Sequence, residues 1–306
     1  MRSIIITVLM LMLPSLAMAQ GQVTRPGKTT PRKPRKTTTV SKPKPTKTTT
    51  ASKPNRNSGT RNNSSSGRTN NSGMTAEQKQ RIIDNLVNNM VYVSGGTFTM
   101  GATSEQGSGA WDNEKPAHRV TLSSYYIGRY EVTQAEWKAV MGSNPSNFKG
   151  DNLPVECVSW NDCQEFIRKL NTLTGKNFRL PTEAEWEFAA RGGNNSSGYK
   201  YSGSGNIGSV AWYTENSNGK THPVGQKSPN ELGLYDMSGN VFEWCQDWYG
   251  SYPSYAQTNP TGPNSGSYRV HRGGSWGDSA RRCRVSFRNY NTPDISINYL
   301  GLRLVL

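Results

Sequence analysis

Apolar residues recur at helical spacing soon after Met74, which predicts that the folded part of the chain begins there. The segment Thr75-Ala76-Glu77-Gln78 resembles a capping box. The apolar residues that follow it at helical spacing are Ile82, Ile83, Leu86, Val87 and Met90. Three further helices are predicted behind the N-caps Thr133, Ser159 and Thr182, the second running to about Leu173 and the third from Glu183 to Ala190.

Short alternating segments predict strands around these helices. Residues 91–93 and 96–101 alternate as two strands around a Gly-Gly turn. Further strands are expected at residues 118–122, 154–158 and, to close the chain, 300–306. Beyond Arg191 no long helix is apparent, and Gly, Asn, Ser and aromatic residues alternate in short runs. The pattern predicts one α+β domain over residues 74–306, rich in loops and poor in regular secondary structure.

The N-terminal quarter of the chain has a different composition. Met1 to Ala19 holds an early Arg2, an apolar run and a small-residue cleavage pattern, which is typical of a signal peptide. Residues 20–73 consist mainly of Thr, Ser, Pro, Asn, Gly and basic residues, so they have too little apolar surface to fold and are predicted to form a disordered linker. The protein is therefore expected to be exported and to be periplasmic, cell-surface or secreted.

The net charge of +15 belongs to this linker and not to the folded part. Residues 20–73 carry 13 Lys and Arg and no acidic residue; with Arg2 also set aside, residues 74–306 keep a net charge of +1. The basic tail is suited to an anionic cell-surface polymer or a membrane, or to a simple spacer role. The nearly neutral domain lacks the basic stripe typical of nucleic-acid-binding proteins, so we do not expect it to bind nucleic acid. We expect the protein to be a monomer.

The final stretch, residues 269–306, is irregular between two fixed ends. It opens at Gly273-Gly274, where the backbone can approach another segment closely, and it ends in an apolar run. Polar, aromatic and basic residues without helical or strand periodicity lie between them. Such an arrangement is how a rigid scaffold presents a binding or catalytic surface.

Six segments in order along the chain closely resemble the formylglycine-generating enzyme, or sulfatase-modifying factor, family. They are Gly96 to Gly101 (GTFTMG), Glu131 to Trp137 (EVTQAEW), Pro154 to Asp162 (PVECVSWND), Arg179 to Glu187 (RLPTEAEWE), Gly233 to Trp244 (GLYDMSGNVFEW) and Arg272 to Trp276 (RGGSW). The resemblance covers about residues 91–306 and implies a single domain of the C-type-lectin-like type with bound calcium. Activity does not follow from the fold.

The founding activity of that family uses copper held by two cysteines shortly after the GGS segment. In this chain Cys283 is the one cysteine there, so the resemblance lacks a copper ligand. Copper would require Cys283 together with Cys245, the pair that remains as the catalytic candidate. The alternative is that the four cysteines, which include Cys157 and Cys163, form disulfides or stay as buried thiols.

The resemblance also implies two calcium sites. The first would use Asp236, the carbonyls of Gly239 and Val241, and Glu243, an oxygen-only set that suits a hard cation. Alternatively, Asp236 caps the adjacent turn and Glu243 pairs with an arginine. The second site would use Asn206, the carbonyl of Ile207, and Asn216.

A second resemblance is confined to the last stretch, which is similar to the targets of diversity-generating retroelements. In those proteins Asn codons of the form AAC are mutated at their adenines. Residue types reachable in this way occupy Gly277, Asp278, Ser279, Arg282, Phe287, Tyr290, Ile295, Ser296, Ile297, Asn298 and Tyr299. Residues 277–306 contain no Lys, Glu, Gln, Met or Trp, which such codons cannot encode. Undiversified members of the family look similar in this stretch, so a fixed surface is also compatible with the pattern.

These patterns favour an exported protein that binds a protein or glycan ligand and is stabilised by calcium. The residues predicted to contact the ligand are Trp276, Asp278, Ser279, Arg282, Phe287, Tyr290, Ile295, Ile297 and Tyr299. Solvent-facing aromatic rings would supply rigid contact area, and the polar residues would supply adjustable hydrogen bonds. The alternative is an active copper-dependent oxidase that converts a sulfatase cysteine to formylglycine.

Overall fold

The computed structural model describes residues 73–306. The predicted signal peptide and most of the predicted linker lie outside the described residues. Within residues 73–306, no helix combines the length and the apolar character needed to cross a bilayer.

The principal helices begin where the sequence pattern predicts. They are α1 (Ala76–Asn88), α2 (Gln134–Met141), α3 (Trp160–Thr174) and α4 (Glu183–Ala190). Thr75, Thr133, Ser159 and Thr182 each form a capping box with the residue three positions later. Such boxes satisfy backbone N–H groups that would otherwise lack partners, which is why the helix starts can be predicted locally. Shorter helices are α5 (Ile207–Val210) and the 3-10 turns η1 (Ser104–Gly109), η2 (Asp112–Glu114), η3 (Gly193–Asn195) and η4 (Ala280–Cys283).

The strands form three small sheets. They are β1 (Met90–Val93), β2 (Gly96–Met100), β3 (His118–Leu122), β4 (Tyr125–Gly128), β5 (Phe242–Trp248), β6 (Gln257–Thr258), β7 (Arg269–Arg272), β8 (Arg288–Asn291) and β9 (Leu300–Gly301). The sheet orders are β1-β4, β2-β3-β6 and β8-β7-β5-β9. The third sheet matters most here, because three of its four strands belong to residues 269–306.

The segments on either side of the Gly-Gly turn are strands as predicted, and β1 pairs with β4 whereas β2 pairs with β3. Two other strand predictions need correction. Residues 154–158 make one bridge, from Pro154 to Thr133, and no strand. The closing strand is limited to β9, after which Val305 bridges Ile127 and Arg179. In each case the backbone partners come from distant segments, which a local pattern does not identify.

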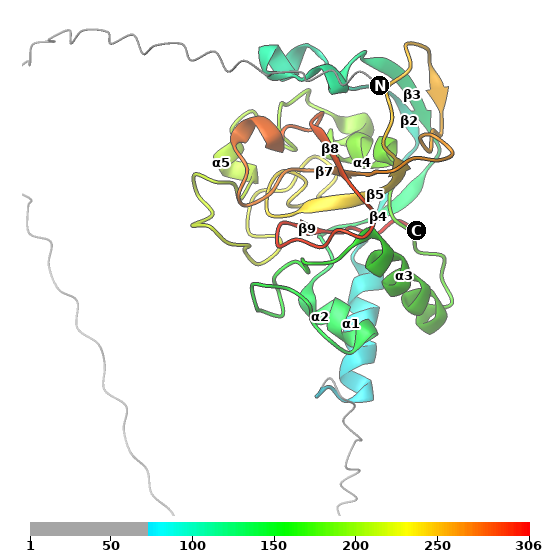
Figure 1. Ribbon diagram of the computed structural model, residues 1–306, viewed down its shortest axis with the longest axis vertical. Helices are drawn as coiled ribbons and strands as arrows, with labels where there is room; N and C mark the ends of the chain where they lie inside the picture. Colours follow the sequence, from blue (N-terminus) through cyan, green and yellow to red (C-terminus); the bar gives the residue numbers. More distant parts are fainter. Residues whose placement is uncertain (1–72) are drawn as a thin grey trace, which may run out of the picture. The chain divides into compact units, whose positions relative to one another are not determined.

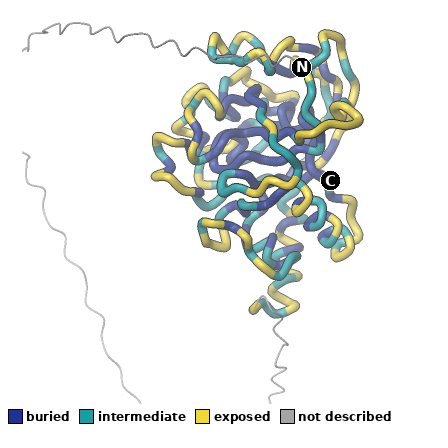
Figure 2. The backbone as a smooth tube through the Cα atoms, viewed as in Figure 1, coloured by how far each residue is buried: buried dark blue, intermediate teal, exposed yellow. Residues whose placement is uncertain are grey.

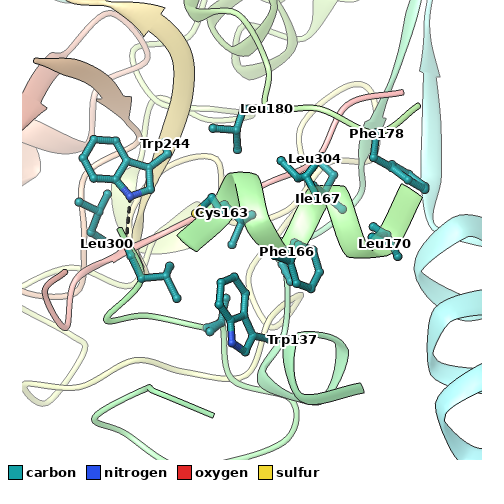
Figure 3. Close-up of a cluster of buried hydrophobic side chains, with 14 of the residues drawn as sticks. Trp137, Cys163, Phe166, Ile167, Leu170, Phe178, Leu180, Trp244, Leu300 and Leu304 are labelled. Atoms are coloured by element: carbon teal, nitrogen blue, oxygen red, sulfur yellow. Dashed lines mark hydrogen bonds between the residues drawn. The ribbon is translucent and has the colours of Figure 1, made fainter. Parts of the chain in front are cut away.

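The helices and sheets enclose two large clusters of buried apolar side chains. In the first, α3 packs against α2, with the rings of Phe166 and Trp137 stacked at 4.9 Å (Figure 3). The indole of Trp244 on β5 lies in the same cluster and donates to the carbonyl of Val158 at 3.0 Å. The second cluster lies around α4, every residue of which is buried, and the adjoining strands. Helices α1, α2 and α3 gather on one side of the β8-β7-β5-β9 sheet (Figure 1), and the buried segments run beneath exposed loops (Figure 2).

Candidate binding surface

Directly after β7, at Gly273-Gly274, the backbone of the C-terminal stretch passes close to Arg282 and Cys283. Gly273 and Gly274 have φ angles of 99° and 76°. A Cβ on Gly274 would lie 2.8 Å from Sγ of Cys283 and 2.9 Å from the carbonyl oxygen of Arg282. Only glycine therefore fits at this turn without a shift of the backbone that follows. The prediction that the backbone approaches another segment here is confirmed.

Four buried arginines hold the stretch to the rest of the domain, and we call them with their carboxylate partners the arginine frame. Arg272 pairs with Glu187, Arg284 with Glu114, Arg288 with Glu183 and Arg303 with Glu243. Each arginine side chain is at most 2 % exposed. The partners come from η2, α4 and β5, so the frame ties the stretch to three separate elements. Because a buried charge is tolerated only when it is paired, the frame fixes the path of the chain.

Most of the positions between these arginines face solvent. Exposed or partly exposed are Trp276, Gly277, Ser279, Arg282, Tyr290, Ile295, Ser296, Ile297, Asn298 and Tyr299. Two expectations are wrong. Phe287 is 1 % exposed, because its ring packs between Trp111 and Phe242. Asp278 is also buried, and its carboxylate is engaged by the Ser275 hydroxyl and by Arg282, so it is not free for adjustable contacts.

One group of predicted contact residues comes together around Trp276. The indole N–H of Trp276 donates to the carbonyl of Asn298 at 2.9 Å, which joins the start of the stretch to its last loop. Tyr299 lies in the same group: burial, with the nearby Asp278 carboxylate, raises the pKa of its phenol. Arg282 donates to Asp278 at 3.1 Å from a side chain that is 45 % exposed. The group therefore offers an aromatic platform with a partly exposed cation at its edge.

Tyr290 belongs to a different group on β8. Its ring packs against Tyr249 at 4.0 Å and against Tyr268 at 5.1 Å. Tyr268 and Tyr290 are both exposed, and β8 is an edge strand of its sheet. Ile295 is exposed on the turn that follows, where its N–H donates to the carbonyl of Thr292. The predicted residues thus form more than one contact group.

Sequence reasoning missed two aromatic residues that join the first group. Phe148 meets Trp276 edge to face at 5.4 Å. Trp111 lies under the guanidinium groups of Arg281 and Arg282, at 5.1 and 5.8 Å from its ring centre. Both residues come from loops more than a hundred positions upstream, so no local signal in the final stretch could have identified them.

The two cysteines of the copper alternative are buried in different clusters. All four cysteines are free thiols. Cys245 is packed with α4 and the strands around it, whereas Cys283 lies in a separate cluster with Tyr201 and Tyr213. Burial raises the pKa of both thiols far above the ordinary value. Burial disfavours the thiolate form that binds copper, and none of the four cysteines forms a disulfide. Copper at Cys245 and Cys283 stays a prediction.

The first predicted calcium set fits a cation only in part. Asp236 is buried, its Oδ2 accepts from the N–H of Gly225 at 2.7 Å, and its Oδ1 has no partner within residues 73–306. Burial raises the pKa of Asp236 to about 6. Glu243, in contrast, is held by Arg303 at 2.7 Å and by the indole of Trp186 at 2.6 Å, so its carboxylate serves the arginine frame. Asp236 suits a metal, Glu243 does not in this conformation, and calcium stays a prediction.

The second predicted set is committed to local hydrogen bonds. The side chain of Asn206 accepts from Gly208, and the carbonyl of Ile207 accepts from Ala211. Asn216 accepts from Tyr213 and donates to Ala211. Across residues 73–306, no three His, Cys, Asp or Glu side chains are grouped so as to hold a metal. Calcium at this set also stays a prediction.

Residues 75–306 match the family described as "Sulfatase-modifying factor enzyme 1-like domain". The chain belongs to this family. The family resemblance and the α+β, loop-rich fold predicted from sequence are both confirmed. Among curated relatives, "Chaperone protein LppX" of Paenibacillus barcinonensis is 38 % identical over 58 % of this chain and 80 % of its own length. "Formylglycine-generating enzyme" of Mus musculus is 33 % identical over 70 % of this chain and 74 % of its own length.

Solved structures of similar fold include "Treponema denticola variable protein 1" and PvdO from Pseudomonas aeruginosa. The first has a TM-score of 0.65 and 35 % sequence identity, and the match covers 71 % of this chain and 94 % of that one. The second has a TM-score of 0.59 and 28 % identity, over 71 % and 93 %. One family thus includes proteins named as an enzyme, a chaperone and a variable protein, so activity must be argued from the site.

Proposed function

We propose that the protein is an exported ligand-binding protein whose C-terminal surface holds a protein or glycan. The observation that carries this proposal is the contrast between the buried arginine frame and the outward-facing side chains mounted on it. Rigid aromatic rings with polar neighbours are the composition of efficient binding sites. The residues assigned to the ligand are Trp276, Arg282, Tyr290, Ile295, Ile297 and Tyr299, with Trp111 and Phe148 added from the structure.

The names of two similar proteins support binding over catalysis. A relative named as a chaperone favours a protein ligand, and a structure named as a variable protein favours a surface whose residues change. Diversification is tested on the gene itself. The codons of Gly277, Ser279, Tyr290 and Tyr299 should end in C, and codons with other third bases would exclude a retroelement origin.

The oxidase alternative is separated by a copper titration followed by oxygen uptake in the presence of a cysteine-containing sulfatase peptide. We expect no turnover, because neutral Cys245 and Cys283 lie in separate clusters. Turnover that disappears in Cys283→Ser would refute the binding proposal. Export is tested by N-terminal sequencing of the mature protein, which should begin at Gln20.

Binding is tested by screening the full chain against a glycan array and against extracellular proteins. For a ligand found in this way, Tyr299→Ala should weaken binding by at least about thirtyfold, the effect of losing a central aromatic contact. Tyr126→Ala is the matched control, since Tyr126 is an exposed tyrosine on β4. Equal losses in both variants would remove the surface assignment.

A further inference from the structure

A cavity of about 210 Å³ lies at the start of α4, lined from β3, α4, β5 and the loop that follows β5. It is open to solvent, because the exposed Tyr255 and Ser251 form part of its wall. Arg288 is the residue that it takes from the C-terminal stretch, and the predicted contact residues Trp276 and Tyr299 do not line it. The cavity is therefore a separate feature from the proposed binding surface.

Asp247 on β5 is the unsatisfied group in this cavity. The residue is 4 % exposed. Its Oδ2 accepts from the N–H of Glu183 at 2.9 Å, whereas its Oδ1 receives no hydrogen bond from any described residue. A Cβ on Gly262 would lie 3.2 Å from Oδ1, so the glycine keeps open the space beside that oxygen. No arginine or lysine pairs with Asp247 in the described part of the chain.

The other charged groups of the cavity are already paired. Arg288 donates to Glu183 at 2.6 and 2.8 Å and to the carbonyls of Asn113 and Gly250. Glu183 also accepts from the hydroxyl of Tyr252 at 3.1 Å. Because the guanidinium is occupied in this way, an anionic ligand would have to break existing bonds. The cavity therefore has no free cationic group for an anionic ligand, whereas its carboxylate can accept a cationic one.

Aromatic rings form the remaining wall. Tyr252, Tyr255 and Trp248 line the cavity, and Tyr255 is 69 % exposed with its ring available to a ligand. Tyrosine and tryptophan faces attract cations and also cover short alkyl chains. A buried carboxyl group that has no ion-pair partner and one oxygen without a hydrogen bond, next to aromatic faces, is a combination that recognises an organic cation.

We propose that this cavity is a binding site for a small organic cation that places its ammonium group on Oδ1 of Asp247 and its alkyl part against Tyr252 and Tyr255. The ammonium supplies a directly bonded cation, which Asp247 lacks among residues 73–306. Hydrogen bonds to charged partners are stronger than neutral ones, so the carboxylate should dominate affinity.

Binding of a cation is coupled to a proton. Burial and the Glu183 carboxylate raise the pKa of Asp247 to about 8, so the free site is largely protonated at neutral pH. The charged and titratable groups that face it are Glu183 and Glu185 from α4, Arg288 from β8, Arg269 from β7, Arg179 from the segment before α4, His118 from β3 and Tyr252 from the loop. An ammonium ligand must displace the proton of Asp247, and affinity should therefore fall in acid.

The test is calorimetric titration of the full chain with n-butylammonium chloride at pH 8, with 1-butanol and glucose as neutral comparisons. We expect the ammonium to bind and both neutral molecules to fail. Asp247→Asn keeps an acceptor for the N–H of Glu183 and should weaken ammonium binding about tenfold or more. Asp84→Asn, a change on the exposed face of α1, is the matched control and should bind as the unchanged protein does.

A second measurement keeps the proposal testable if Asp247→Asn fails to fold. Ammonium affinity of the unchanged protein should be about fiftyfold weaker at pH 6 than at pH 8, because the proton on a group with a pKa of about 8 must be released. The same titration in His118→Gln removes the imidazole that lines the cavity, and the loss of ammonium affinity at pH 6 should persist. Equal affinity for butanol or glucose, no ammonium binding, or affinity independent of pH would each overturn the proposal.

Discussion

The arginine frame and the surface that it carries belong to one stretch of chain and differ in their exposure to solvent. Arg284 and Glu114 are fully buried and bonded to each other, whereas the side chain of Arg282, two residues earlier, is 45 % exposed. A charge pair excluded from water must remain intact, because either member alone would be stranded. An arginine whose guanidinium is largely hydrated, such as Arg282, contributes less to stability and can be exchanged at lower cost. The fold therefore constrains the buried arginines of the frame and leaves the exposed residues between them free to vary.

The largest effect should come from breaking the frame. Arg284→Met leaves the Glu114 carboxylate buried without its partner, and we expect a loss of about 3–5 kcal/mol in the free energy of unfolding, measured with urea. Arg282→Met is the matched control and should cost less than about 1 kcal/mol. Adding Glu114→Gln to Arg284→Met should restore part of the loss. Equal effects of the two single changes would remove the distinction between frame and surface.

Phe287 and Tyr290 provide an aromatic version of the same contrast. Phe287→Ala empties a space between Trp111 and Phe242 and should cost about 3–5 kcal/mol. Tyr290→Ala removes a ring that is 39 % exposed and should change stability by about 0.5 kcal/mol or less. Thermal unfolding of the two variants measures the difference. A stable Phe287→Ala protein would show that this ring is not part of the core.

Asp236 and Glu131 are the carboxyl groups near Arg303 that the frame leaves without a paired arginine. Burial, with the carboxylates of Asp236 and Glu243, raises the pKa of Glu131. If calcium binds at Asp236, its presence at a hundredfold excess over its dissociation constant should add about 2.7 kcal/mol to stability. Melting curves with calcium and with chelator measure this gain, and Asp236→Asn should abolish it. Identical curves would count against the predicted site.

His271, next to Arg272 on β7, should make the stability of the protein sensitive to acid. Burial lowers its pKa to about 3, so the folded protein keeps the ring neutral while the unfolded chain takes up a proton below its ordinary value of 6.5. The contribution of His271 to the free energy of unfolding is therefore fully present well above pH 6.5 and is lost as the pH falls from there toward 3. The loss from this residue between pH 6.5 and 5 should be about 2 kcal/mol. His271→Gln should flatten this limb of the stability curve, and an unchanged slope would exclude His271 as its source.

Prediction from sequence succeeded where the determining contacts are local. The four capped helices and the Gly273-Gly274 turn depend on neighbours within a few positions. It failed where partners are remote. Phe287 was expected at the surface because phenylalanine is a residue type that a mutated Asn codon can encode, but Trp111 and Phe242 cover it. Phe148 could not be found from the stretch that it joins.

The amino-acid sequence by itself determined the family, the helix starts and the stretch that carries the candidate surface, since motifs and caps are read from adjacent residues. Only the tertiary structure decided which side chains of that stretch are free. It separated Cys245 from Cys283, buried Asp278 and Phe287, and placed an unpaired Asp247 in a cavity. The physical reason is that burial and charge pairing are set by elements distant in sequence, and these decide whether a residue supports the fold or meets a ligand.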